Sequence, residues 1–189
     1  MERGEEAQAL MAALARGERA ALARLIALYG PGVQRFIAAQ LGSRSEAEDI
    51  AQEVFLRVWA QAGRYDPAKG AVSSWIWRIA LNLCIDRRRR LGWRRFLGLE
   101  AAPETADEAP DAEAVLDGRQ RLAQTRAALA RLPERQRAAL LLRAAGGLAT
   151  AEIAAALGVS PGAAEQLLVR GRAGLRAQLG PGSREEEKG

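Results

Sequence analysis

Several residue types that carry chemistry in other proteins are missing or scarce in this chain of 189 residues. Histidine, the commonest general base and metal ligand, is absent, and Cys84, the single cysteine, cannot form an internal disulfide. No apolar run approaches the roughly 20 residues of a membrane-spanning helix. The opening MERGEE is acidic, whereas a secretory signal begins with basic residues. We therefore expect a cytoplasmic protein that does not insert into a membrane and holds no metal or cofactor, and an enzymatic function is disfavoured.

What the chain does contain is helical periodicity. Apolar residues recur at helix spacing on both sides of a stretch rich in alanine, proline and acidic residues, and no alternating β-branched pattern suggests a strand. The sequence predicts an all-α protein with two small helical domains, residues 1–91 and 119–180. A flexible acidic linker is expected at 92–118 and a tail at 181–189.

Charge is distributed unevenly between these segments. The net charge is +4 for residues 1–91, −5 for residues 92–118 and +7 for residues 119–180. Two basic blocks flanking an acidic connector suit a chain that meets a polyanion at two separate places, because phosphate contact depends on local charge. The alternative is a pair of solvated basic domains without a polyanionic partner.

The segment from Glu46 to Trp59 separates into two helix faces. An apolar face predicted to enter the core holds Ile50, Val54, Phe55 and Val58. The opposite face holds Asp49, Gln52, Glu53 and Leu56. That second face is either ordinary solvated surface or a docking surface for a basic partner, where charge pairing would fix the register.

A second informative helix is SSWIWRIALNLCIDRRRR, from Ser73 to Arg90. Ser73 or Ser74 is predicted to cap it, and Trp77 and Cys84 are interpreted as core residues. A separate face combines an aromatic ring, an amide and guanidinium groups, which suits bases and phosphates; it holds Trp75, Arg78, Asn82 and Arg89. The alternatives are a structural role for Trp75 and Asn82, and a solubilising basic helix end.

The C-terminal segment has helix-turn-helix punctuation. A short helix from about Thr150 to Leu157 is expected to end at Gly158, and Ser160 with Pro161 is expected to start the next helix. The second helix of such a motif lies in a DNA major groove. A plain helical hairpin is the alternative.

Taken together and in order, these motifs carry a family resemblance. The set DIAQEVFLRVW, RYDPAKG, SWIWRIALNLCIDRRRR, LPERQRAALLLR and AEIAAALGVSPGAAEQLLVRGRAGLR resembles the extracytoplasmic-function sigma factors of bacterial RNA polymerase. The resemblance implies an alternative sigma factor that binds core polymerase, recognises promoters, opens DNA and is regulated by an anti-sigma factor. It also implies that residues 1–91 form sigma region 2 and residues 119–180 form sigma region 4.

The resemblance further implies a role for each surface. Core polymerase, through its beta-prime clamp, is expected to contact Asp49, Gln52, Glu53 and Leu56. Minus-ten DNA, duplex or single-stranded, is expected to contact Lys69, Trp75, Arg78, Asn82, Arg87, Arg88, Arg89 and Arg90. Minus-thirty-five DNA is expected to contact Ser160, Gly162, Glu165, Gln166, Arg170, Arg172 and Arg176. The beta flap is expected to contact the segment from Leu132 to Arg143.

The last helix departs from the family pattern, and two other classes of DNA-binding protein are considered as alternatives. Gly171 and Gly174 lie inside the last helix, where each costs up to about 1 kcal/mol of helix propensity, so region 4 is expected to be marginal alone. The alternative is a stand-alone two-domain helix-turn-helix regulator that binds duplex DNA independently of polymerase. A response-regulator version of it would need an α/β receiver domain, and residues 1–91 show no strand pattern. A small recombinase would need a nucleophile with a nearby base, and the serines here lie in turns and caps.

Overall fold

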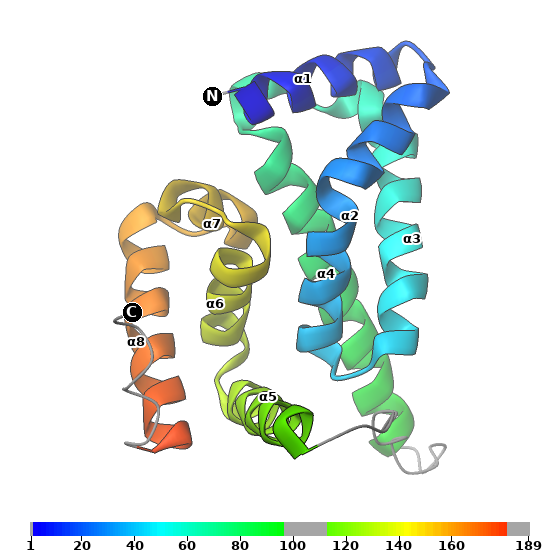
Figure 1. Cartoon of the computed structure of the whole chain (residues 1–189). Helices are drawn as coiled ribbons and strands as arrows, with labels where there is room; N and C mark the ends of the chain where they lie inside the picture. Colours follow the sequence, from blue (N-terminus) through cyan, green and yellow to red (C-terminus); the bar gives the residue numbers. More distant parts are fainter. Residues whose placement is uncertain (1, 97–112, 181–189) are drawn as a thin grey trace.

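The computed structural model describes residues 2–96 and 113–180, with side chains described for residues 3–91 and 120–180. Over these two ranges the chain forms α-helices and short 3-10 turns and no strand, which confirms the all-α prediction (Figure 1). The helices are α1 (Glu2–Ala15), α2 (Arg19–Leu41), α3 (Arg44–Gln61), α4 (Val72–Phe96), α5 (Glu113–Arg131), α6 (Glu134–Gly146), α7 (Thr150–Leu157) and α8 (Pro161–Leu179). The 3-10 turns are η1 (Ala62–Arg64) and η2 (Pro67–Lys69), which connect α3 to α4.

Local chemistry explains where several helices begin and end. Gly42 ends α2 with φ +78°, a left-handed conformation that costs glycine little. The Ser43 hydroxyl oxygen then accepts a hydrogen bond from the Glu46 amide at 3.3 Å and caps α3. The predicted serine cap of α4 is wrong, because α4 already begins at Val72 and Ser74 is a buried first-turn residue.

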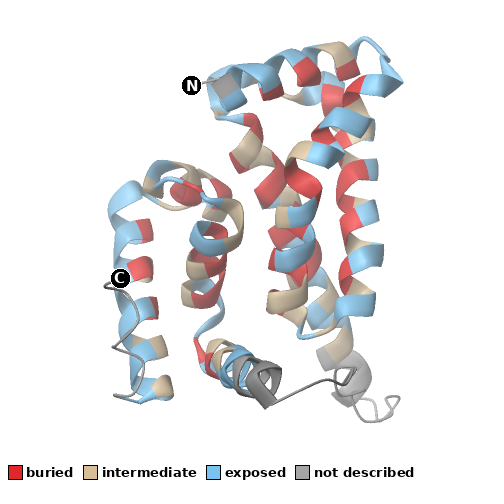
Figure 2. Cartoon of the chain, in the orientation of Figure 1, coloured by how far each residue is buried: buried red, intermediate tan, exposed pale blue. Residues whose placement is uncertain are grey.

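The N-terminal half of the molecule consists of α1 to α4. Helices α2, α3 and α4 run side by side, and α1 lies across one end of them (Figure 1). Their facing sides are buried (Figure 2), and Val33, Val54, Val58 and Ile76 each have no exposed surface. Of the apolar α3 residues predicted to enter this core, Val54, Phe55 and Val58 are buried and Ile50 is half-buried.

The C-terminal half consists of α5 to α8, and its glycines have a packing role. A Cβ atom at Gly171 would lie 3.0 Å from Cγ of Leu140 and 3.2 Å from the Gln136 carbonyl oxygen of α6. A Cβ atom at Gly174 would lie 2.7 Å from Cδ2 of Leu132. The two glycines therefore let α8 approach α6 and the end of α5, so their cost in helix propensity is offset by close packing.

The two halves share one continuous hydrophobic core, with α2 against α6 and α4 against α7. Trp77 of α4 contacts Phe36 of α2 edge-on, with ring centroids 5.3 Å apart. Its indole also lies where a Cβ atom on Gly146 of α6 would come within 2.9 Å of Cζ2. The prediction that Trp77 and Cys84 are core residues is confirmed, since each side chain is 2 % exposed.

Two helices extend into the predicted linker bounds of 92–118. Helix α4 continues to Phe96 and α5 begins at Glu113, so both ends of the predicted linker are helical. Residues 97–112 and the predicted tail at 181–189 lie outside the described residues. Across the described part of the chain, no helix has the length and apolar character needed to cross a bilayer.

The burial of Cys84 predicts a pH dependence of stability. Burial raises the pKa of this thiol from 9.0 to about 12, so the unfolded chain loses the thiol proton at lower pH than the folded chain does. The free energy of unfolding should therefore fall as pH rises above 9.0, by about 1 kcal/mol from this group between pH 8 and pH 10. Urea unfolding of wild type and Cys84→Ala at both pH values measures the effect. The pKa values of Tyr29 and Tyr65 are also raised by burial, but both proteins keep these groups. Parallel pH dependences in the two proteins would contradict the prediction.

The glycines of α8 predict opposite effects of the same substitution. Gly171→Ala should lower the free energy of unfolding by about 1–3 kcal/mol, because the new methyl group meets Leu140 and a backbone carbonyl of α6. Gly162→Ala is the matched control in α8, where a Cβ atom would have nothing within 4 Å. The control should leave stability unchanged or raise it by up to about 1 kcal/mol through helix propensity. Urea denaturation measures both, and a stabilised Gly171→Ala protein would mean that α8 does not approach α6 as described.

Candidate promoter and polymerase interfaces

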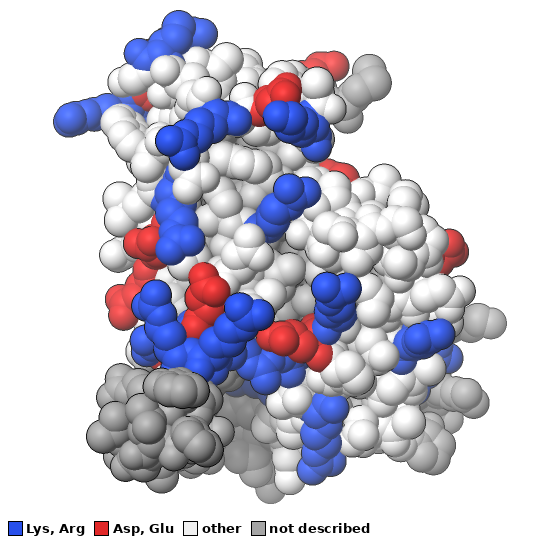
Figure 3. All heavy atoms as spheres, turned by 180° about the vertical axis from the view of Figure 1, so that it is seen from behind, with Lys and Arg blue, Asp and Glu red and all other residues white. Residues whose placement is uncertain are grey.

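The outer face of α3 is polar and open. Asp49, Gln52 and Leu56 are exposed, and Leu56 is 62 % exposed although it is a large apolar residue. Glu53 is half-buried and pairs with Arg57 one turn along the helix, at 2.8 Å between Oε1 and Nε. The structure thus places the four predicted polymerase-binding residues on or beside one face of α3. On the face of the molecule opposite to that seen in Figure 1, basic and acidic side chains lie close to one another (Figure 3).

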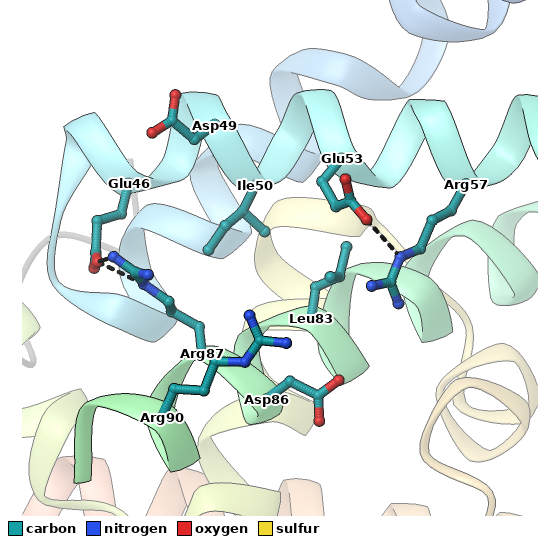
Figure 4. Close-up of a pocket in the computed structure, with 9 residues that line it drawn as sticks. All are labelled: Glu46, Asp49, Ile50, Glu53, Arg57, Leu83, Asp86, Arg87 and Arg90. Carbon is teal, nitrogen blue, oxygen red and sulfur yellow. Dashed lines mark hydrogen bonds and ion pairs between the residues drawn. The ribbon is translucent and has the colours of Figure 1, made fainter. Parts of the chain in front are cut away.

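A groove of about 390 Å³ lies between α3 and α4 beside this face (Figure 4). At one end of it, Nε of Arg87 donates to Glu46 Oε1 at 2.8 Å, and the Nη2 donor of the same guanidinium reaches the same oxygen. Asp49 lies at the edge of the groove, with its carboxylate directed away from it (Figure 4). The groove is lined by Glu46, Asp49, Ile50, Glu53, Arg57, Leu83, Asp86, Arg87 and Arg90.

The Glu46–Arg87 pair ties the start of α3 to the last third of α4. Both side chains are partly buried, with 23 % and 40 % exposed, so this pair is shielded from water more than an ordinary surface pair. Sequence reasoning missed Glu46, although its acidic charge in the first turn of α3 was visible. Arg87, predicted to contact DNA, therefore has an acidic partner within the chain, whereas Arg89 and Arg90 are exposed at the same end of α4.

The turn that leads into α4 is held by its own hydrogen bonds. The Asp66 carboxylate accepts a hydrogen bond from the Ala68 amide at 3.0 Å, and the Tyr65 hydroxyl donates to the Gly70 carbonyl at 3.0 Å. The Tyr65 ring lies against Trp75, with centroids 5.6 Å apart, so Trp75 is half-buried rather than open. Lys69 is exposed on this turn, with Nζ 3.4 Å from Asp66 Oδ2.

Farther along α4, the predicted DNA-binding residues differ in how accessible they are. Asn82 is exposed one turn beyond Arg78. Arg78 donates from Nη2 to the Ala155 carbonyl oxygen of α7, so it lies at the junction of the two halves. Arg88 is 3.6 Å from the Glu134 carboxylate of α6. The structure therefore places the predicted set on α4, except Lys69 on the preceding turn, and Arg78 and Arg88 have partners within the chain although both remain exposed.

The predicted helix-turn-helix is present in α7 and α8. Gly158 ends α7 with φ +65°, and the Ser160 hydroxyl oxygen accepts a hydrogen bond from the Ala163 amide at 3.2 Å. The Ser160 oxygen predicted to meet DNA thus also caps α8. The start of α7 lacks a side-chain cap, and Glu152 instead accepts a hydrogen bond from the Ala149 amide at 2.9 Å.

Burial divides this motif into an inner and an outer face. Ile153 and Ala154 of α7 pack with Ala164 and Leu168 of α8, all at most 3 % exposed. The outer face of α8 is exposed and holds every residue predicted there, namely Gly162, Glu165, Gln166, Arg170, Arg172 and Arg176. Val169, 52 % exposed, lies on the same helix and was left out of the predicted set. A helix with this exposure can present polar and basic groups to duplex DNA.

The three predicted sets do not converge on one pocket. Two lie on the neighbouring helices α3 and α4, and the third lies on α8 in the other half. No group of three or more possible metal ligands occurs in the ranges that the structure covers. Separate exposed surfaces on different helices suit large partners that extend over the molecule rather than a small substrate.

Comparison with known proteins agrees with this arrangement. Residues 25–94 match the family model for Sigma-70 region 2, and residues 122–175 match that for Sigma-70, region 4. The chain is 36 % identical to the ECF RNA polymerase sigma factor SigE of Mycolicibacterium smegmatis over 178 residues, which is 90 % of this chain and 67 % of that protein.

Two solved structures have a similar fold. CnrH in complex with the cytosolic domain of CnrY has a TM-score of 0.72 at 25 % identity, covering 92 % of this chain and 97 % of that one. The sigma factor RpoE in complex with the anti-sigma factor NepR from Bartonella quintana has a TM-score of 0.68 at 23 % identity, covering 82 % and 94 %. With both region models matched and a relative of this identity spanning most of the chain, the protein belongs to the extracytoplasmic-function family of RNA polymerase sigma factors.

Proposed function

We propose that this sigma factor divides its work between three helices: α3 binds core polymerase, α4 holds and opens minus-ten DNA, and α8 reads minus-thirty-five DNA. The observation that carries the proposal is the exposure of an acidic face on α3 and a polar, basic face on α8 within one chain. An independent DNA-binding regulator would need the second face but not the first.

Docking through α3 follows from charge and shape. Asp49 and Gln52 present polar atoms to solvent, and Leu56 adds an exposed apolar contact between them and the end of the helix. A basic helix of the polymerase beta-prime clamp would be complementary to this face, because opposite charges set the register and speed encounter. The Arg57–Glu53 pair at the edge of the face keeps the Glu53 carboxylate in place.

Helix α4 is suited to an unpaired DNA strand. Trp75 provides an aromatic ring near the start of the helix, Asn82 an exposed amide, and Arg89 with Arg90 exposed positive charge near the C-terminal end. Aromatic rings stack on bases and arginines hold backbone phosphates, while an amide can read a base edge. Opening a duplex costs a few kcal/mol per extruded base, which contacts of this kind offset.

Helix α8 is suited to the major groove of the upstream promoter element. Gln166 can pair with a base edge, and Arg170 can hold a phosphate or a guanine. Glu165 makes this face less basic than its arginines alone would suggest, and Val169 adds an exposed apolar side chain. Helix α6, within the segment from Leu132 to Arg143, is proposed to meet the beta flap.

Further partners and the place of action follow from the family. CnrH and the Bartonella RpoE were each solved with a second protein, in the latter case an anti-sigma factor. An anti-sigma factor is therefore proposed as a regulator of this chain as well. The site of action is the cytoplasm, where RNA polymerase meets promoters, and the catalytic chemistry of transcription belongs to core polymerase rather than to this subunit.

The α3 proposal predicts the effect of one charge reversal. Asp49→Lys should weaken binding to core polymerase at least about tenfold, because a like charge then faces the basic partner. Glu5→Lys is the matched control, since it makes the same charge change at an exposed position on α1. Fluorescence anisotropy of labelled protein titrated with core polymerase measures both, with circular dichroism to confirm helicity. Equal affinities of the two variants would remove α3 from the interface.

The α4 proposal predicts that substitutions of base-reading and of phosphate-binding residues have different effects. Arg89→Ala should weaken promoter binding by holoenzyme and lower the salt dependence by roughly one released counterion. Asn82→Ala should keep the salt dependence but reduce strand opening, because the amide acts on a base outside the stack. Promoters selected from a random library provide templates for permanganate footprinting and run-off transcription, with and without core polymerase. Normal strand opening and normal base preference in Asn82→Ala would mean that Asn82 is a structural residue. Specific binding to duplex DNA without core polymerase would favour a stand-alone regulator.

A further inference from the structure

A cavity of about 380 Å³ lies where α1, α2 and α6 meet. None of the residues that line it is among those proposed to contact polymerase or DNA. Its volume lies within the range of small-molecule sites, which is about 300–1,000 Å³. Apart from two arginines, the wall consists of apolar and aromatic side chains and of glycine backbone. The cavity therefore has the size and the lining of a ligand site.

The charged residues of this cavity are all basic. Arg3 of α1 and Arg35 of α2 line it, and no aspartate or glutamate does. The groove between α3 and α4, in contrast, is lined by four acidic residues as well as by arginines. Arg35 is exposed and has no hydrogen-bond or ion-pair partner in the described part of the chain. Two guanidinium groups without a carboxylate between them favour an anion at this place.

Arg3 is already held in position at the edge of the cavity. Its Nη2 donates to the Leu28 carbonyl oxygen of α2, and its guanidinium carbon lies 5.5 Å from the centroid of the Tyr29 ring. A guanidinium has five N–H donors, so this one hydrogen bond leaves others free for a ligand. The planar fork of arginine matches the oxygens of a carboxylate or a phosphate. An anion would thus meet a donor that loses little freedom on binding.

The third polar group of the cavity wall is a buried donor without an acceptor. Trp77 lines the cavity and is 2 % exposed, yet its indole Nε1 has no hydrogen-bond partner among the described residues. The ring edge that carries Nε1 lies against Gly146, where a Cβ atom would be 3.0 Å from Cε2. Gly146 itself lines the cavity. Because a buried N–H without an acceptor costs free energy, an oxygen that reached this edge would be bound favourably.

We propose that this cavity binds a small organic anion, in which a carboxylate or a phosphate is attached to a flat apolar body. The anionic group pairs with Arg35 and Arg3, and the apolar body lies along the apolar wall between α2 and α6. A ligand oxygen beside Gly146 gives the Trp77 N–H the acceptor that it lacks. The inference does not depend on the roles proposed for α3, α4 and α8.

Calorimetric titration of the full-length protein tests the chemical class of the ligand. Phenyl phosphate and benzoate are the probes, because each joins an anionic group to a flat ring and they differ in the anion. Phenol and inorganic phosphate supply the two parts separately. At least one of the two probes should bind about tenfold or more tightly than either part, since only the whole molecule uses both the arginines and the apolar wall.

The position of the bound probe is read from the indole N–H resonances in a ¹⁵N–¹H correlation spectrum. The chain has four tryptophans, and Trp59→Phe, Trp75→Phe and Trp93→Phe assign three of the signals, which leaves Trp77. The probe that binds should shift the Trp77 signal most, because that N–H gains an acceptor or lies beside the ligand. The Trp59 and Trp75 signals should stay in place, since neither residue lines the cavity.

A charge reversal tests the role of the arginines. Arg35→Glu should weaken probe binding at least about tenfold, because a carboxylate then faces the anion. Arg44→Glu is the matched control, since it makes the same charge change at an exposed position that does not line the cavity. The control should bind the probe as wild type does. Circular dichroism confirms that both variants keep their helices.

Three results would each overturn the inference. The first is that neither probe binds more tightly than phenol and inorganic phosphate, so the cavity does not combine the two kinds of contact. The second is a probe that shifts the other indole signals and leaves Trp77 unchanged, which places it elsewhere. The third is an equal effect of Arg35→Glu and Arg44→Glu, which means that only the overall charge of the protein matters.

Discussion

The burial of Trp77 is the contact on which the whole arrangement depends. This side chain projects from α4, meets Phe36 of α2 edge-on and reaches the glycine turn at the end of α6. An indole buries on the order of 150–250 Å² of surface. Other contacts between the two small helical halves could not easily make up for the loss of this area. Because the ring touches both α2 and α6, it connects the interiors of the two halves into one core.

Helix α4 consequently has three different environments along its length. Its first turns contact α7, its middle is buried against α2 on one side and exposes Asn82 on the other, and its later part pairs with α3 through Arg87 and Glu46. One rigid helix thus borders the proposed polymerase surface, the proposed DNA surface and the junction between halves.

Predictions from the sequence succeeded where the pattern was local. Helical period located α3, and end signals located α7 and α8, because a Ser cap or a left-handed Gly acts on backbone groups a few residues away. The interpretation of the glycines in α8 was incomplete for the opposite reason: propensity describes Gly171 in an isolated helix, whereas its value here lies in the contact with Leu140. The start of α4 was misplaced because Ser73 and Ser74 look like caps, although Ser73 donates to a residue 79 positions away.

The sequence by itself determined the helices, their inner and outer faces, and the family to which the chain belongs, since each depends on the order and spacing of residues along the chain. Only the tertiary structure decided which exposed groups are available. Arg78, Arg87 and Asn82 look alike as polar residues on α4, yet the first contacts α7, the second pairs with Glu46 and the third faces solvent. These differences come from contacts between residues far apart in the chain, which helical period does not encode.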